Sequence, residues 1–109
     1  MPYGQTPGET LKGGTMRIIV EFLGDARLAT SIKQTELDIV PRTTYRDLVR
    51  LAGERFPALI GAVIEGDGET LMPANILNLN GKRTIQTTQM DDNPSDGDRI
   101  TFMSILAGG

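Results

Sequence analysis

Four short stretches of the chain alternate between apolar and polar residues, with the period of two that is typical of β-strands. The first begins at Met16 and ends near Gly24, and the second stops at Val40, so the two predict a hairpin. Further alternations at 77–80 and 100–105 predict a third strand and a final strand. Successive side chains point to opposite faces of a strand, so one face of each is expected to be buried. The expected inward residues are Ile18, Val20, Phe22, Leu37, Ile39, Leu77, Leu79, Ile100 and Phe102.

One segment has helical periodicity instead. Apolar residues recur from Tyr45 to Phe56 at the spacing that places them on one face of a helix. Thr44 stands before this face as the expected N-cap, and Asp47 falls in the first turn, where a negative charge is favourable. Pro57 ends the pattern directly after Phe56. The pattern therefore predicts one main amphipathic helix.

The order of these elements is two strands, one helix and two strands. One helix can cover only one face of a sheet, so the sheet is expected to curl around it in a two-layer α+β domain. This ββαββ order, with a mixed sheet around one main helix, predicts a β-grasp fold. We assign the domain to residues 16–109 and interpret the preceding residues 1–15, rich in glycine and proline, as a flexible N-terminal extension.

Three residue types are absent from the chain, and their absence excludes several kinds of catalytic and metal-binding site. The 109 residues include no cysteine, histidine or tryptophan, so thiol nucleophiles, Ser-His-Asp triads and zinc or iron–sulfur sites lack their essential groups. We therefore expect no metal site, no bound cofactor and no catalytic residue in this chain.

Charge and hydropathy indicate which classes of partner and which cellular compartment to expect. The net charge of −3 and the sequence pI near 4.8 argue against a nucleic-acid partner. No apolar run approaches the roughly 20 residues of a membrane-spanning helix, and no signal-peptide pattern is present. The lack of cysteine agrees with a reducing compartment, so a cytoplasmic protein without a membrane partner is expected.

The final strand is followed by Ala107, Gly108 and Gly109. The last two residues have no side chain, so this tail can enter a narrow channel of a partner where a Cβ atom would collide. The backbone carboxylate of Gly109 is then the candidate reactive group, and a partner must first activate it, most naturally as an acyl-adenylate. The alternative is that the terminal glycines only fray and carry no function.

The last fourteen residues, Asp96 to Gly109, resemble the closing motif of the ubiquitin-like sulfur carriers, in which a D-G-D turn leads through a hydrophobic strand to Gly-Gly. The stretch LNLNG at 77–81 resembles the third strand and turn of that family, and TTYRDLV at 43–49 resembles the start of its helix. The resemblance spans the predicted domain. It is closer to the small subunit of molybdopterin synthase than to the thiamine-pathway carrier, and it extends to the archaeal small modifier proteins and the ubiquitin-related modifier. The family often has Pro-Pro before its tail, where this chain has Ser104-Ile105, so the stiffness of that tail is not carried over.

This resemblance implies a carrier cycle. An adenylating enzyme would use ATP to activate Gly109, a sulfur donor would convert it into a thiocarboxylate, and the sulfur would pass to a biosynthetic intermediate. The implied partners are the adenylating enzyme and the large subunit of molybdopterin synthase or another sulfur acceptor enzyme, and the protein is a cosubstrate rather than an enzyme. An alternative is a protein modifier joined through Gly109 to lysines of target proteins. A third interpretation is a β-grasp interaction module with an inert tail.

Several side chains near the tail are candidates for contacting such partners. Met103 and Ile105 alternate with the inward residues of the final strand, so we expect them to be exposed on the outer face beside the tail. With Leu106 and Arg99 they form the expected docking residues, and Ile19 is an expected neighbour. The alternative is that the N-terminal extension covers this face.

Other charged residues allow two interpretations each. Arg17 and Arg99 either pair with acidic groups of a partner or are simply solvated. Asp96 and Asp98 flank Gly97 and are interpreted as turn formers rather than as a catalytic or metal-binding pair. If the protein is conjugated to itself, its lysines are the acceptors; otherwise they add solubility. These lysines are Lys12, Lys33 and Lys82.

Overall fold

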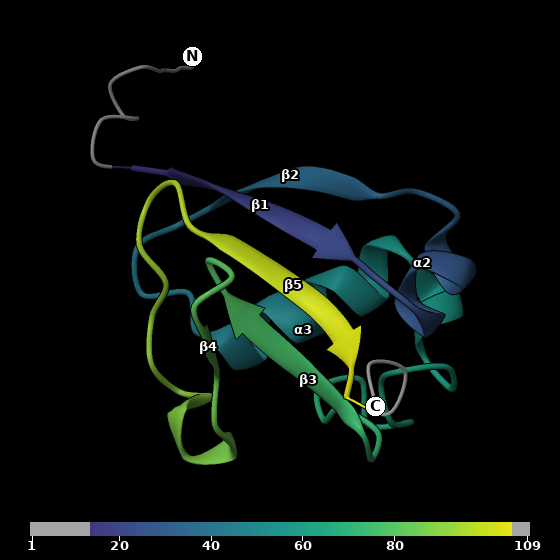
Figure 1. Ribbon diagram of the computed structural model, residues 1–109. Helices are drawn as coiled ribbons and strands as arrows, with labels where there is room; N and C mark the ends of the chain where they lie inside the picture. The colour runs from purple at the N-terminus through teal and green to yellow at the C-terminus, as the bar shows by residue number, and fades with distance from the viewer. Residues whose placement is uncertain (1–13, 106–109) are drawn as a thin grey trace.

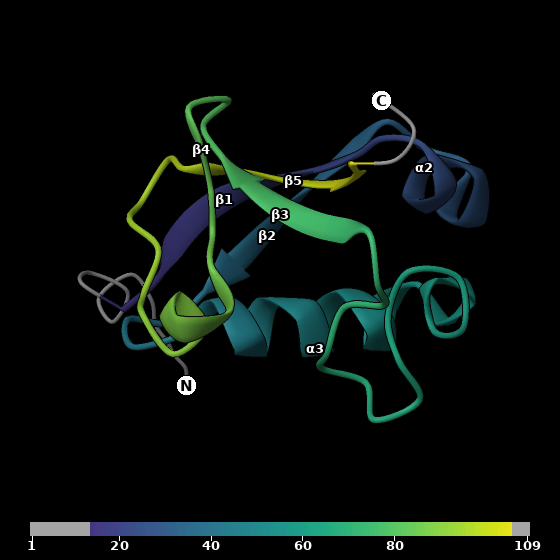
Figure 2. The same ribbon diagram turned by 60° about the horizontal axis from the view of Figure 1, so that its bottom comes forward.

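Five strands and two helices form two layers, with the sheet lying over the longer helix (Figures 1 and 2). The computed structural model describes residues 14–105. The predicted tail and most of the predicted extension therefore lie outside the described residues. The elements are β1 (Met16–Phe22), α2 (Asp25–Thr30), β2 (Gln34–Ile39), α3 (Tyr45–Arg55), β3 (Asn75–Leu79), β4 (Arg83–Thr84) and β5 (Arg99–Ser104), with 3₁₀ turns at Pro57–Leu59 and Thr87–Gln89.

The strands form one mixed sheet in the order β2-β1-β5-β3-β4. β1 and β5 run parallel, with Phe22 opposite Phe102, whereas the other neighbouring strands are antiparallel. The last strand of the sequence is thus the central strand of the sheet. A mixed sheet packed on one main helix confirms the predicted β-grasp class.

The core lies between the sheet and α3. Phe22 is the centre of an aromatic cluster, with its ring centroid 5.3 Å from that of Phe56 and 5.8 Å from that of Phe102. All of the strand residues expected to point inward are buried, except Leu79, which is half-buried. The helix buries the expected face against them, through Tyr45, Leu48, Val49 and Ala52.

Two elements were missing from the four-strand, one-helix prediction. α2 lies within the connection between β1 and β2, and it buries Ala26 as its only fully buried residue. β4 has two residues and pairs with β3 across the turn at Asn80 and Gly81, both with positive φ. Six residues of helix and two of strand are too short to establish a hydrophobic period, so the sequence pattern did not show them.

The start of α3 is held by a reciprocal cap. Asp47 N–H donates to Thr44 Oγ1 and Thr44 N–H donates to Asp47 Oδ2, both at 3.0 Å. The bond from the Thr44 backbone, together with the ion pair to Arg50, keeps the pKa of Asp47 below its ordinary value of 3.8. A carboxyl group whose pKa is lowered by folding stabilises the fold only while it is ionised.

We expect the Asp47→Asn variant to lose about 0.5 kcal/mol of stability at neutral pH, because the charge that favours the helix N-terminus and Arg50 is removed. The difference from the wild type should begin to shrink as the pH falls below 3.8, and it should disappear once the pH is also below the lowered pKa of folded Asp47, where this carboxyl is neutral. Urea unfolding of both proteins over a pH series measures this. A difference that does not change with pH would contradict the role given to the charge.

Candidate functional site

The final strand leads the chain out of the middle of the sheet. β5 lies between β1 and β3, and at its end Ser104 is opposite Asn75. Ile105 follows, and its N–H donates to the C=O of Ala74 at 2.8 Å. The predicted site residues Leu106, Ala107, Gly108 and Gly109 come directly after this point and lie outside the described residues.

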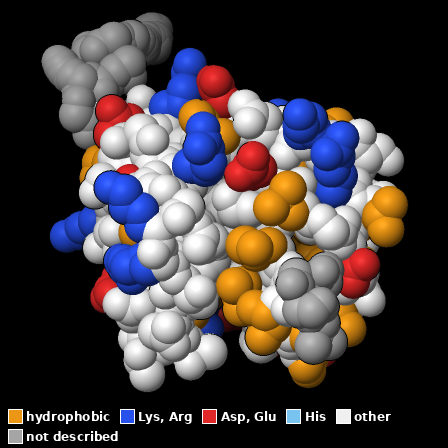
Figure 3. All heavy atoms as spheres, in the orientation of Figure 1, with side chains coloured by type: hydrophobic (Ala, Val, Ile, Leu, Met, Phe, Trp, Pro, Cys, Tyr) orange, Lys and Arg blue, Asp and Glu red, His pale blue; other side chains and the backbone are white. Residues whose placement is uncertain are grey.

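Apolar side chains are exposed on the outer face of the sheet where β5 ends (Figure 3, lower right). Ile105 is 54% exposed and Met103 is partly exposed, as the alternation predicted. Ile76 lies opposite Met103 on β3, and Leu23, 39% exposed, follows β1 and donates its N–H to the C=O of Phe102 at 2.9 Å. We call Leu23, Ile76, Met103 and Ile105 the apolar patch.

Two members of the apolar patch, Leu23 and Ile76, were not among the predicted docking residues. Both occupy outward positions of their strands' alternation, which was a usable signal, but only the strand order shows that they adjoin Met103. α2 packs near the same end of β1 and β5 and carries Leu28, which is 79% exposed.

One prediction about this face was wrong. Ile19 pairs with Arg99 at the beginning of β5, four residues from Met103 and therefore roughly 13 Å away along the strand, so it does not join the patch. Thr101 alternates with the inward residues of β5 as Met103 does, yet it is only 5% exposed. It lies on the central strand between two others, and its hydroxyl donates to Glu21 Oε1 at 2.9 Å.

The two arginines of this face differ in their pairing. Arg17 is bound to Asp38 at 3.0 Å and to Glu36 at 3.4 Å, and the hydrogen bond to Asp38 is the main cause of the raised pKa of its guanidinium. Arg99 is exposed and forms no ion pair within residues 14–105. Of the two, Arg99 is therefore the one whose charge remains open to a partner.

The D-G-D segment is a structural turn. Asp96 accepts the N–H of Arg17 at 2.7 Å, and Asp98 accepts the Nδ2 of Asn80 at 3.0 Å. Gly97 has a φ of 86° and donates its N–H to the C=O of Arg17 at 2.8 Å. The carboxylates tie the start of β5 to β1 and to the β3–β4 hairpin, which agrees with their interpretation as turn formers.

The two described lysines lie on opposite ends of the sheet. The C=O of Lys33 accepts the N–H of Phe22, at the end where β5 leaves the sheet. Lys82 follows the Asn80-Gly81 turn at the other end, and both lysines are exposed as expected. Lys12 lies outside the described residues.

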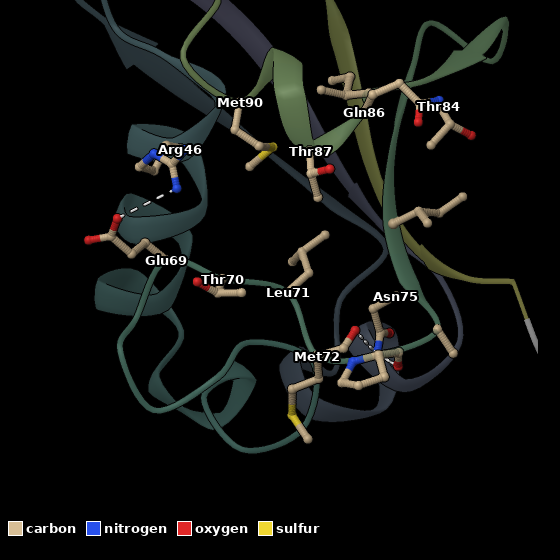
Figure 4. Close-up of a pocket in the computed structure, with 14 residues that line it drawn as sticks. Arg46, Glu69, Thr70, Leu71, Met72, Asn75, Thr84, Gln86, Thr87 and Met90 are labelled. Carbon is tan, nitrogen blue, oxygen red and sulfur yellow. Dashed lines mark hydrogen bonds and ion pairs between the residues drawn. The ribbon is translucent and has the colours of Figure 1, made fainter.

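A separate hollow of about 430 Å³ lies between α3 and the β3–β4 side of the sheet (Figure 4). Leu71 and Met90 form apolar walls of the hollow. Arg46 lies at one side of it and forms ion pairs with Glu69 at 3.8 Å and with Asp91 at 3.0 Å.

Over residues 14–105 no group of three or more acidic, histidine or cysteine side chains is arranged to hold a metal ion. Over the same residues no helix has the length and hydropathy needed to cross a membrane.

No family model and no curated protein matches the chain. Solved structures match it over most of its length. SAMP1 from Haloferax volcanii has a TM-score of 0.71 and 19% identity, covering 85% of this chain and 99% of that one. Urm1 from Trypanosoma brucei has a TM-score of 0.64 and 28% identity, covering 87% and 97%. A candidate molybdopterin converting factor subunit 1 from Pyrococcus furiosus has a TM-score of 0.63 and 15% identity, covering 82% and 97%.

These neighbours match the ubiquitin-like group of carriers and modifiers that the sequence resembles. The chain therefore has the ubiquitin-like β-grasp fold. The neighbours include both a small archaeal modifier protein and a candidate molybdopterin converting subunit. Their names therefore do not favour one of the two leading functional hypotheses over the other.

Proposed function

We propose that this ubiquitin-like protein is a sulfur carrier whose Gly109 is adenylated and then converted into a thiocarboxylate, with the sulfur delivered to molybdopterin synthesis. The observation that carries the proposal is the position of β5. It is the central strand, it ends beside the apolar patch, and the Gly-Gly motif begins four residues after Ser104 in sequence. Such an arrangement allows a partner to hold the sheet and receive the tail at the same time.

The chemistry needs no side chain of this chain. The Gly109 carboxylate attacks the α-phosphorus of ATP on the adenylating enzyme, forming an acyl-adenylate and releasing pyrophosphate. Sulfide then attacks the carbonyl carbon and AMP leaves, so one carboxyl oxygen is replaced by sulfur. ATP is consumed by the partner, and this protein is the cosubstrate.

The apolar patch is the proposed docking surface for the adenylating enzyme, and for the large subunit that later takes the sulfur. Arg99, at the other end of β5, is a separate proposed contact. Apolar patches rimmed by polar groups are common at protein interfaces. Arg99 adds a charge that no described carboxylate neutralises. The predicted docking residue Leu106 would continue this surface toward the tail.

We expect Met103→Asp to raise the KM of the adenylating enzyme for this protein at least about tenfold, because a charge in the patch must be desolvated in the complex. Leu51→Asp is the matched control, since Leu51 is 38% exposed on α3, away from the sheet's outer face. Steady-state pyrophosphate exchange with both variants measures the effect. Equal KM values for the two variants would remove the patch from the interface.

The proposed function itself is tested by intact-mass measurement. The protein is incubated with an adenylating enzyme of the ubiquitin-activating type, ATP and sulfide, and then weighed. The expected product has one oxygen of the C-terminus replaced by sulfur. Formation of the acyl-adenylate without this replacement would argue against a carrier.

A protein modifier is the second candidate. It is favoured by the fold similarity to SAMP1 and by the two exposed lysines, Lys33 and Lys82, which would serve as acceptors in self-conjugation. The lysine amine would attack the same acyl-adenylate, releasing AMP and leaving an amide bond to Gly109. Peptide mapping of the source cell should then find the tail on lysines of other proteins. Trypsin would leave the whole segment after Arg99 attached, so a protease that cuts nearer the tail is needed.

A further inference from the structure

A row of polar residues crosses all five strands directly beside the apolar patch. The strand register places the members opposite one another, and they are Gln34, Glu21, Thr101, Asn78 and Thr84. The middle three, Glu21, Thr101 and Asn78, lie on the outer face, because the alternate residues of their strands face the core. The apolar patch occupies the next outward positions of the same three strands, two residues or roughly 6.6 Å away. The polar row therefore borders the patch.

Two side chains of the polar row have hydrogen-bond acceptors that the protein does not use. Glu21 is half-buried, and Oε1 accepts the hydroxyl of Thr101 at 2.9 Å. Glu21 forms no ion pair within residues 14–105. The Oδ1 of Asn78 is buried and accepts no hydrogen bond in that part of the chain. A sheltered carboxylate is stabilised by a cation, and a buried acceptor without a donor costs free energy, so the row lacks a cationic donor.

The arginines of this chain do not supply that donor. All of them lie within residues 14–105, and none forms an ion pair with Glu21 there. Arg99 stands two residues before Thr101 on β5, but Ile19 rather than Glu21 is opposite it. The acceptors of the polar row thus remain open on the surface that the docking partner is proposed to cover.

We propose that Glu21, Thr101 and Asn78 receive an arginine side chain of the adenylating enzyme when that enzyme covers the apolar patch. The inference rests on the proposed function, because it names the chemistry that the docking surface recognises. An arginine has an apolar stem and a charged head. The stem would lie on Met103 of the patch, and the head would reach the row beside it.

The arrangement of the acceptors favours arginine over lysine. Glu21 and Asn78 stand on either side of Thr101, two strand spacings or roughly 9.6 Å apart at the backbone. A guanidinium carries five donors in one plane and can donate to both sides, whereas an ammonium is a compact point charge. Glu21 keeps the Thr101 hydroxyl on Oε1 and accepts the guanidinium through Oε2. The Asn78 amide turns about its last side-chain bond, a soft torsion, to offer Oδ1.

The first test removes the charge of Glu21 and keeps its shape. Glu21→Gln retains an oxygen that can accept the Thr101 hydroxyl, so its melting temperature should stay close to that of the wild type. In steady-state pyrophosphate exchange its KM should rise about tenfold with kcat unchanged, because a hydrogen bond to a charged group is lost in the docked complex. Glu54→Gln is the matched control, since Glu54 is exposed on α3, away from the outer face of the sheet. It should leave both constants unchanged.

The second test separates binding from stability at Asn78. Asn78→Leu removes the unpartnered oxygen with little change in shape, so the variant should melt at or above the temperature of the wild type. Its KM should nevertheless rise about threefold, because the guanidinium loses an acceptor. A merely structural role would lower stability and affinity together. A lower KM would mean that the partner covers this row with apolar groups, which would overturn the inference.

The third test identifies the partner residue by exchanging charges. Glu21→Arg should raise KM about a hundredfold through repulsion between like charges. Surface arginines of the adenylating enzyme are then changed one at a time to glutamate, and one such variant should recover most of the affinity for Glu21→Arg.

The inference is overturned if Glu21→Gln has the same KM as Glu54→Gln, or if no arginine variant of the enzyme recovers Glu21→Arg. Absence of exchange with the wild-type protein would instead overturn the proposed function. Exchange without later replacement of oxygen by sulfur would overturn the carrier role alone. The failures are therefore distinguishable.

Discussion

Deleting Gly109 should abolish adenylation while leaving the melting temperature almost unchanged. The deletion moves the carboxylate back by one extended residue, about 3.5 Å. Misplacement of a reacting group by about 1 Å can already cost roughly a hundredfold in rate, so this displacement prevents attack on the bound nucleotide. The residue lies five positions beyond Ser104, where β5 ends, so no strand pairing is touched. Pyrophosphate exchange and thermal melting measure the two expectations.

Gly109→Ala is the companion variant, because it keeps the length of the tail and adds only a Cβ atom. We expect it to lose activation as well, since the added atom collides with a channel shaped for glycine. Adding a residue after Gly109 would move the carboxylate in the other direction and should be equally inactive. Normal exchange by the deletion variant would remove the reason for placing function at the tail.

Unlike the deletion of Gly109, the Phe102→Ala variant should lose stability, with a fall of about 3–5 kcal/mol in the free energy of unfolding. Phe102 is 2% exposed, lies opposite Phe22 and Leu77 in the sheet, and packs its ring 5.8 Å from that of Phe22. Removing the ring leaves a cavity in the centre of the core. The melting temperature should fall by at least about 12 °C.

Phe102→Leu is the control for this prediction, because it retains most of the apolar volume and should cost clearly less. Urea unfolding gives the free energies for both variants. A loss below about 1 kcal/mol for the alanine variant would mean that Phe102 does not carry the packing assigned to it.

The parts of the fold that could be predicted are those with a local pattern of sufficient length. α3 has eleven residues, one apolar face and a capping threonine, Thr44, and each of these is visible in the sequence. β1, β2 and β5 each have at least six residues and a clear alternation. α2 and β4 lack that length, and their existence depends on the elements against which they pack.

The candidate site was likewise predictable only where it follows from a local pattern. Alternation along β5 placed Met103 and Ile105 on the outer face, and both lie there. Thr101 has the same phase in β5, but its neighbours on two flanking strands bury it. Alternation tells which face a side chain points to, whereas exposure also depends on what stands on either side.

The sequence by itself determined that cysteine, histidine and tryptophan are absent, which residues face the core, and that Gly108 and Gly109 follow the last strand. These are properties of composition and of neighbours along the chain. The tertiary structure decided that β5 lies between β1 and β3, which brings Leu23 and Ile76 to Met103 and the C=O of Ala74 to Ile105. Those contacts join residues about 30 to 80 positions apart, and a pairing over such separations is selected by the packing of the whole core rather than by any local preference.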